Sequence, residues 1–405
     1  MKRFYFIAAM AIMAAACQKT EIQNEVQTPI GFSTEVGKQT RAIVDGQGAD
    51  YKTDQPFAVY AYGHQAGTTE TITTVMDNVE ISYTAGSGEG PTAVPAKWSA
   101  TGTTKYYWPN DPNTTLNFYA YSPALVTNGT ATTDDQKLNG NIDHNETGTT
   151  VGLSLTGYKH TNMYVDFMVA TPVIGAKFSA SDPNGLTTAI EPAGTVPVVF
   201  NHQMTQILFN VTTDKVYPGV TFTVESIKLE NVKNTGDYTH SNLIPSYDFT
   251  SGTFTHGEWE NQEVMDNSEP YVIFPATGES EVELAYATDA TSSTPLEVMT
   301  TTGVTMIPQN MVQVTTDVTA GADTYANQTV AQMFEITYSI EGTGVATETV
   351  TKHVPFFAYS ANSAVNWGVN QKITYTVKIG LNEILFEPTV ADWTETPGTD
   401  YTFQQ

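Results

Sequence analysis

The segment ITYTVKIGL, residues 373–381, alternates apolar and other side chains without a break. Successive side chains of a β-strand point to opposite faces, so a period of two indicates a strand with one buried face. The apolar face of this segment consists of Ile373, Tyr375, Val377, Ile379 and Leu381. Beyond residue 16 no stretch shows a sustained helical period, and the pattern of residues 373–381 therefore sets the fold class that we expect for the whole chain.

The same alternation recurs in shorter segments bounded by Gly, Pro, Asn and Asp, which are typical of turns. The clearest apolar faces are Phe57, Val59 and Ala61; Leu116, Phe118 and Ala120; and Ile207, Phe209 and Val211. In residues 221–232 the phase shifts after Val224, and a bulge near Glu225 would explain the shift. The mostly apolar run 163–173 predicts a strand buried on both faces, whereas residues 128–150 are polar and are expected to form a long loop.

A chain of 405 residues is long enough for two domains with separate cores. Residues 179–197 have the Pro, Gly and Ser content of a connection between domains. Many short strands separated by turns are typical of sandwiches. We therefore predict an all-β fold with two β-sandwich domains in tandem, over residues 42–190 and 191–405.

Charge and motifs exclude several classes of function. The net charge of −26 leaves no basic stripe for nucleic acid. The seven histidines have no zinc-ligand spacing, and there is no phosphate-binding loop, nucleophile elbow or HExxH motif. Residues 132–146 are rich in oxygen ligands but lack EF-hand spacing, so a solvated loop is expected rather than a calcium site. We expect no enzyme, no metal and no cofactor.

One group of aromatic residues supports an alternative function. Such side chains on strand faces most often pack in cores and at edges, but they can also form a platform on which sugars stack. The alternative is a surface glycan-binding lipoprotein, and its platform would consist of Tyr106, Tyr107, Trp108, Tyr119 and Tyr121.

The N-terminus has the pattern of an export signal. Lys2 and Arg3 precede an apolar run, residues 4–16, that is too short to span a bilayer and ends in small residues. The sequence Ala14-Ala15-Ala16-Cys17 is similar to a bacterial lipobox, although Leu is commoner than Ala at the first of these positions. We therefore predict a signal peptide over residues 1–16 and lipid, such as palmitate, on Cys17, which is the only cysteine.

A short strand pattern follows the lipidation site. Residues 18–28 are polar and suit a spacer, and in residues 29–36 Ile30, Phe32 and Val36 share one face. Gly37 ends the pattern, and the loop-like residues after it carry Arg41, the only arginine downstream of Arg3. Exposed loops are where proteases cut. Residues 17–41 are thus interpreted as a lipidated leader that contains the first strand.

An ordered set of segments resembles the fimbrillins, the type V pilins of Bacteroides-type bacteria. The segments are KYYWP (105–109), LNFYAYSP (116–123), YVDFMVA (164–170), VPVVFNHQMTQILFNV (196–211), IKLENV (227–232), MIPQ (306–309) and ITYTVKIGLNEILFEPTVADW (373–393). The resemblance implies two tandem transthyretin-like β-sandwiches, export as a lipoprotein, and a structural subunit of a fimbria (pilus) at the outer membrane that serves cell adhesion.

The resemblance also implies a mechanism. An Arg-specific protease would cut after Arg41, leaving Ala42 as the new N-terminus and removing the leader strand with Ile30, Phe32 and Val36. A strand donated by another fimbrial subunit would then fill the groove, as in β-strand addition. Residues 383–393, or the tail around Tyr401 and Phe403, could be the donor. A fimbrial anchor that stays uncut and lipidated, or a tip protein that donates no strand, remain alternatives.

Overall fold

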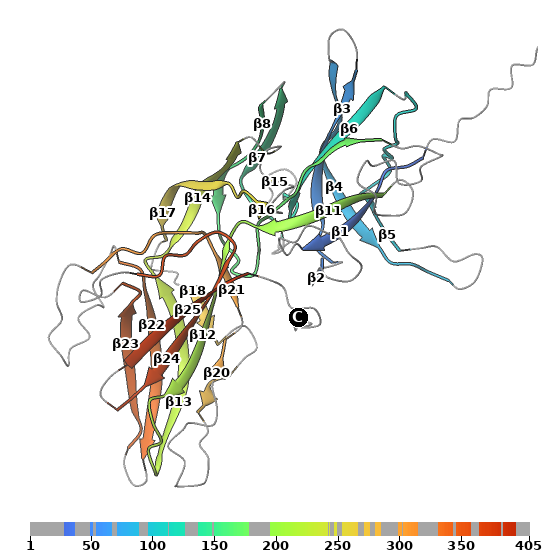
Figure 1. Ribbon diagram of the computed structural model, residues 1–405. Helices are drawn as coiled ribbons and strands as arrows, with labels where there is room; N and C mark the ends of the chain where they lie inside the picture. The colour runs from blue at the N-terminus through green and yellow to red at the C-terminus, as the bar shows by residue number, and fades with distance from the viewer. Residues whose placement is uncertain are drawn as a thin grey trace, which may run out of the picture.

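The computed structural model describes residues 28–36, 49–51, 54–66, 71–88, 96–111, 113–125, 137–147, 150–177, 195–241, 243, 247–248, 253–265, 271–275, 280–284, 299–301, 303–314, 331–342, 346–357, 364–381 and 384–393. The regular elements within these ranges are all β-strands, which confirms the predicted all-β class (Figure 1). Over the same ranges, no helix has the length and apolar character needed to cross a bilayer.

The N-terminal strands form a sheet that closes on itself. Its hydrogen-bonded order is β10-β6-β3-β4-β5-β1-β11-β9, and β9 also pairs with β6, so that seven strands make a ring. A further short strand, β2, pairs with β1. The bounds are β1 Gly31–Val36, β2 Ala49–Asp50, β3 Phe57–Gln65, β4 Thr71–Thr84, β5 Lys97–Ala100, β6 Thr114–Ser122, β9 Met168–Ala170, β10 Val173–Ala176 and β11 Thr195–His202.

One hydrophobic core fills this ring. It includes both apolar faces predicted for the region, Phe57 with Val59 and Ala61 from β3, and Leu116 with Phe118 and Ala120 from β6. In β9 the side chains of Met168 and Ala170 enter this core, whereas Val169 packs on the other side of the sheet. The run 163–173 thus contains a strand buried on both faces, as its apolar sequence predicts.

A second sheet covers the outer face of the ring where β3, β6 and β9 lie. Its order is β17-β14-β8-β7, with bounds β7 Asn141–Thr147, β8 Thr150–Lys159, β14 Lys233–Ser241 and β17 Glu258–Val264. Leu153, Leu155 and Tyr238 of this sheet pack with Tyr119 and Tyr121 of β6. The short pair β15 Tyr247–Asp248 and β16 Thr253–Phe254 adds Phe254 to the same core.

The prediction of a long loop over residues 128–150 is wrong for residues 141–147, which form β7. This strand pairs with β8 from Asn141 to Thr147. Its inward positions include His144 and Glu146, both buried, while Asp143 and Asn145 are exposed. The period of two is therefore present in β7, but polar residues occupy part of the buried face, and a search for apolar alternation passes over it.

The C-terminal strands form a sandwich of two sheets. One has the order β20-β12-β24-β25, with β21 also on β12, and the other has the order β18-β13-β22-β23, with β19 also on β13. The bounds of the first are β12 Thr205–Thr213, β20 Met299–Thr300, β21 Val304–Met306, β24 Gln371–Ile379 and β25 Ile384–Asp392, and those of the second are β13 Val220–Glu230, β18 Tyr271–Phe274, β19 Val282–Glu283, β22 Met333–Gly342 and β23 Glu348–Pro355.

The core of this sandwich contains the residues whose alternation first indicated strands. β12 and β24 run parallel, and Ile207, Phe209 and Val211 lie opposite Ile373, Tyr375 and Val377. The alternation in the sequence extends beyond the strand, however, because β24 ends at Ile379 and Leu381 is exposed. The predicted bulge is confirmed, since the pairing of β13 with β22 shifts register between Val224 and Ser226.

Sheets of this fold contain strands from both sides of the domain boundary that the sequence predicts between residues 190 and 191. β11 pairs with β1 and β9, and β14 pairs with β8 and β17, so that residues 195–202, 233–241 and 258–264 lie with the N-terminal strands. Figure 1 shows the N-terminal ring and the C-terminal sandwich at opposite ends, with β7, β8, β14 and β17 between them. The ranges 42–190 and 191–405 themselves stay a prediction.

Several histidines are buried in the region between the ring and the sandwich, and His160 shows why they stay neutral. Its Nε2 lies 2.6 Å from the Thr305 carbonyl, which can only accept, so Nε2 carries the proton. Its Nδ1 then accepts from the Tyr158 hydroxyl at 2.8 Å. Burial lowers the pKa of His160 to about 4, and burial likewise lowers the pKa of His144 to about 3 and those of His240 and His256 to about 4.

These histidines predict a loss of stability in mild acid. A group whose folded pKa is about 4 and whose unfolded pKa is about 6.5 contributes stability above pH 6.5 that is lost as the pH falls toward 4. His160 alone would lower the free energy of unfolding by about 2 kcal/mol between pH 7 and pH 5. Urea unfolding at the two pH values measures this, and His160→Gln should reduce the pH dependence; an unchanged dependence in the variant would contradict the assignment.

Candidate functional site

The first strand of the chain, β1, closes the N-terminal ring. It lies between β5 and β11, and its pairing with β11 is parallel from Gly31 opposite Thr195 to Val36 opposite Phe200. On its other side it meets β5 at a single pair, Phe32 with Trp98. Among the described residues, the part of β11 from Thr195 to Val199 has β1 as its only strand partner, because β9 pairs with β11 only from Phe200 onward.

The residues just before β1 extend this contact. Ile30 N donates to the Tyr106 carbonyl at 2.9 Å, and Trp108 N donates to the Thr28 carbonyl at 3.0 Å. Pro29 forms an antiparallel bridge with Tyr107 between these two bonds. A proline there costs neither of these hydrogen bonds, because their donors are Ile30 N and Trp108 N. The whole segment from Thr28 to Val36 is therefore held along its length.

The inward side chains of this segment are those that the alternation places on one face. Ile30, Phe32 and Val36 are 6%, 5% and 8% exposed and belong to the core of the ring. The Phe32 ring meets Phe57 and Phe118 edge to face, with centroids 6.0 and 6.2 Å apart. Phe32 thus contacts β3 and β6, which lie across the interior of the ring from β1.

Burial of these three side chains is a large part of what closes the ring. Each buried side chain of this size contributes about 1.5–3 kcal/mol, so that the three together contribute roughly 5–9 kcal/mol. The net stability of a whole domain is about 5–15 kcal/mol. An N-terminal ring that lacked β1 would expose the core side chains facing it and a free edge of β11.

The cleavage and lipidation sites expected from the sequence, Cys17, Arg41 and Ala42, lie outside the described residues. Their place along the chain is nevertheless informative. Residues 37–48, which include Arg41, connect β1 to β2, and β2 pairs back on Glu35 and Val36.

The residue after β2 is held by the ring itself. Tyr51 stacks on Phe200 with centroids 4.8 Å apart, and its hydroxyl lies 2.5 Å from that of Ser122. Gln55 also donates to the Ser122 hydroxyl, at 3.4 Å. Burial raises the pKa of the Tyr51 hydroxyl far above its ordinary value. The chain downstream of residue 48 therefore has contacts to the ring that do not involve β1.

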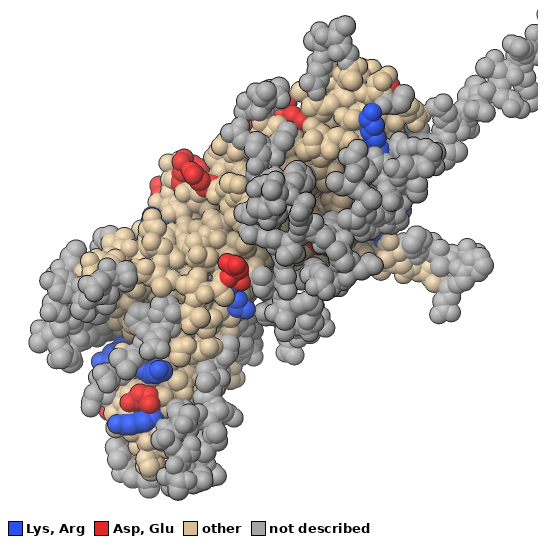
Figure 2. Space-filling view, in the orientation of Figure 1, with Lys and Arg blue, Asp and Glu red and all other residues tan. Residues whose placement is uncertain are grey.

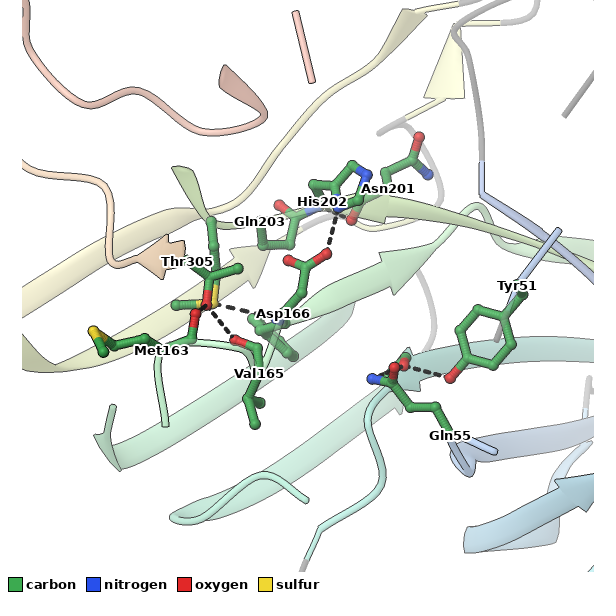
Figure 3. Close-up of polar contacts among 12 residues, drawn as sticks. Tyr51, Gln55, Met163, Val165, Asp166, Asn201, His202, Gln203 and Thr305 are labelled. Carbon is green, nitrogen blue, oxygen red and sulfur yellow. Dashed lines mark hydrogen bonds and ion pairs between the residues drawn. The ribbon is translucent and has the colours of Figure 1, made fainter. Parts of the chain in front are cut away.

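The far end of β11 contacts the C-terminal strand. His202 Nδ1 lies 2.5 Å from Asp166 Oδ2 (Figure 3), and the indole of Trp393 stacks flat on the His202 ring at 3.8 Å. Trp393 directly follows β25, which pairs with β24 from Ile384 to Asp392. Of the first expected donor segment, residues 383–393, the residues 384–392 are thus already part of a sheet in their own molecule, while Tyr401 and Phe403 lie outside the described residues.

A polar group beside His202 joins the sheets, and the sequence provides no signal for it. The Gln203 side-chain carbonyl accepts from the Tyr238 hydroxyl at 3.0 Å, and its backbone carbonyl accepts from Trp259 Nε1 at 2.8 Å. The Thr305 hydroxyl of β21 donates to the Val165 carbonyl at 2.7 Å (Figure 3). These contacts join residues that are distant in sequence.

The aromatic platform considered as an alternative is wrong. Trp108, Tyr119 and Tyr121 are buried in the N-terminal cores, and burial raises the pKa values of both tyrosines strongly. Only Tyr107 is exposed, and Tyr106 is partly buried against the ring core.

The carboxylates Glu281 and Glu283 are exposed. In Figure 2 the described Lys residues lie singly or in small groups, several of them beside acidic residues.

Comparisons with known proteins give one family. A family model described as fimbrillin-like matches residues 40–393. A fimbrial protein from Bacteroides vulgatus is similar in structure, with a TM-score of 0.47 and 18% identity over 90% of this chain and 99% of its own. The tip fimbrial protein Mfa3 from Porphyromonas gingivalis has a TM-score of 0.31 and 11% identity over 91% of this chain and 100% of its own. No curated protein matches.

The burial of Phe32 predicts a large effect of its truncation. Phe32→Ala should lower the free energy of unfolding of the uncut chain by about 3–5 kcal/mol, because it leaves a cavity in the ring core beside Phe57 of β3 and Phe118 of β6. Ser33→Ala, which changes a partly exposed neighbour, should change it by less than about 0.5 kcal/mol. Urea unfolding compares the two, and equal effects would show that β1 does not pack in this register.

Proposed function

Because the chain belongs to the fimbrillin-like family, we propose that it is a structural subunit of a fimbria, which polymerises by strand exchange after cleavage at Arg41. A family of fimbrial, adhesion-type proteins indicates the cell surface and a structural rather than a catalytic role. The proposal of strand exchange after cleavage at Arg41 rests on β1. This strand is essential to the core, and the chain runs from it to the rest of the ring through residues 37–48, which contain Arg41.

Cleavage would act on the closure of the ring. Before the cut, β1 is held by its own chain; afterwards it is held only by pairing and burial, and it can be exchanged. A donated strand would pair in parallel with Thr195–Phe200 and place apolar side chains where Ile30, Phe32 and Val36 now lie. The burial that the subunit loses with β1 would then be regained between molecules.

The pairing of β25 bears on the source of that strand. Residues 384–392 have a partner along their whole length in β24, so their donation would first break one edge of the C-terminal sandwich. The tail around Tyr401 and Phe403 lies outside the described residues. Because donation of β25 carries this cost, we propose the tail as the donor.

The export route belongs to the same proposal. The signal over residues 1–16 and a lipid on Cys17 would bring the uncut subunit to the outer membrane, where the Arg-specific protease releases it for assembly. An anchor would instead keep Cys17 and β1, and a tip would be cut without donating a strand. The N-terminus of the protein found in fibres distinguishes these positions.

Substitution of Arg41 tests the cleavage step. Arg41→Ala and Arg41→Lys should both abolish polymer ladders on gels, since an Arg-specific protease accepts neither residue, and Lys38→Ala should leave them intact. Subunits isolated from wild-type fibres should begin at Ala42. Fibres in which every subunit begins at lipidated Cys17, or ladders that persist in both Arg41 variants, would refute the proposal.

A peptide of the leader strand tests the exchange directly. Treating the purified chain with an Arg-specific protease and separating the leader should lower the thermal midpoint, and the peptide TPIGFSTEV, residues 28–36, should restore it. The same peptide with Phe32→Ala should bind at least 100-fold more weakly, because about 3 kcal/mol of burial is lost. Equal restoration by both peptides would contradict a groove specific for this side chain.

A further inference from the structure

Three neighbouring strands of the C-terminal sandwich bring two glutamates and a histidine together. Glu335 of β22 lies directly opposite His353 of β23 and also opposite Lys228 of β13. Glu230 follows Lys228 by two residues and so points to the same side of the sheet. The neighbours Leu229 and Phe334 point the other way, into the sandwich core. The three side chains therefore meet on the outer face of the sheet.

Their distances differ from those of hydrogen-bonded ion pairs. His353 Nε2 lies 3.4 Å from Glu335 Oε2 and 3.6 Å from Glu230 Oε2, and the three ligand atoms lie within 4.8 Å of one another. A charge-assisted N–H···O bond would measure about 2.7–2.9 Å. Ligand atoms at about 2.1 Å from a tetrahedral zinc ion are separated by about 3.4 Å. The spacing around His353 thus matches the edges of a zinc site.

We propose that Glu230, Glu335 and His353 bind a zinc ion, with water in the fourth position. The side chains of His353, Glu335 and Glu230 are only 11%, 15% and 19% exposed, so the ion would be largely sheltered from bulk water. Two carboxylates balance the charge of a divalent cation. Calcium and magnesium prefer oxygen ligands, and the imidazole nitrogen is what selects a transition metal such as zinc.

Lys228 sets the geometry and the affinity of this site. Its ammonium lies 2.7 Å from Glu335 Oε1, the oxygen that does not face His353. This bond orients the carboxylate and leaves Oε2 directed at the site. It also places a positive charge beside the metal position, and that charge opposes a bound cation. Removing the Lys228 charge should therefore raise the affinity for zinc, while removing any ligand should lower it.

The site would cross-link the outer part of the sheet. Among the described strands β23 is the edge of the order β18-β13-β22-β23. An ion shared by β13, β22 and β23 would tie this edge strand to two inner neighbours. Metal binding to the folded state alone stabilises it. The role inferred for zinc is therefore structural, a clamp on the edge of the C-terminal sandwich.

Zinc binding by the full chain tests the inference. Competition with a chromophoric zinc chelator should show one zinc ion per chain, with neither Ca²⁺ nor Mg²⁺ displacing it. His353→Gln and Glu335→Gln should each weaken zinc binding at least tenfold, and Lys228→Gln should strengthen it severalfold. His64→Gln is the matched control, because His64 pairs with Glu146 at 2.6 Å and, among the described residues, is not part of such a group of three.

A second measurement guards against variants that fold poorly. Zinc should raise the thermal midpoint of the wild type and of Lys228→Gln, and should leave that of a folded His353→Gln unchanged. Binding that is equal in wild type, His353→Gln and Glu335→Gln would overturn the proposal, as would the absence of binding in both wild type and Lys228→Gln. Weaker binding in Lys228→Gln than in wild type would overturn the geometry assigned to Lys228.

Discussion

The closure of the N-terminal ring depends on the parallel pairing of β1 with β11. Seven strands complete a circuit only when a strand stands between β5 and β11, and β1 supplies it. The pairing of β1 differs on its two sides, since β1 pairs with β11 from residue 31 to residue 36 but with β5 at only one residue pair. On the β5 side, closure therefore rests on side chains, above all Phe32, and not on a ladder of hydrogen bonds. A strand from elsewhere with apolar residues at the same spacing would satisfy the same constraint.

β11 connects this joint to the rest of the molecule. Its first residues pair with β1, its last residues pair with β9, and His202 at its end stacks under Trp393. The next residue, Gln203, accepts hydrogen bonds from the second sheet, and β12 then begins the C-terminal sandwich. A change in the strand that occupies the groove thus acts on an element whose other end contacts Trp393, directly after β25.

The sequence predicts those parts of the fold where buried faces are apolar. The faces of β3, β6, β12 and β24, the inward residues of β1 and the bulge in β13 all follow from a period of two and its one slip. β7 was missed because His144 and Glu146 occupy its inward positions. Burial of Trp108, Tyr119 and Tyr121 could not be read from their type, since amphipathic rings suit either a core or a surface. Glu230, Glu335 and His353 are brought together only by strand pairing, so no spacing in the sequence predicts this group.

The position of a cut determines whether it opens the ring without destroying it. A cut before Thr28 would leave β1 attached to its own chain, and the groove would stay closed. A cut beyond Tyr51 would remove a residue that stacks on Phe200 and contacts Ser122, so the core would lose more than one strand. Between these limits lie residues 37–48, which join β1 to β2, and Arg41 is the one arginine there. A protease with that specificity would release β1 and leave the ring otherwise complete, which is the condition that strand exchange requires.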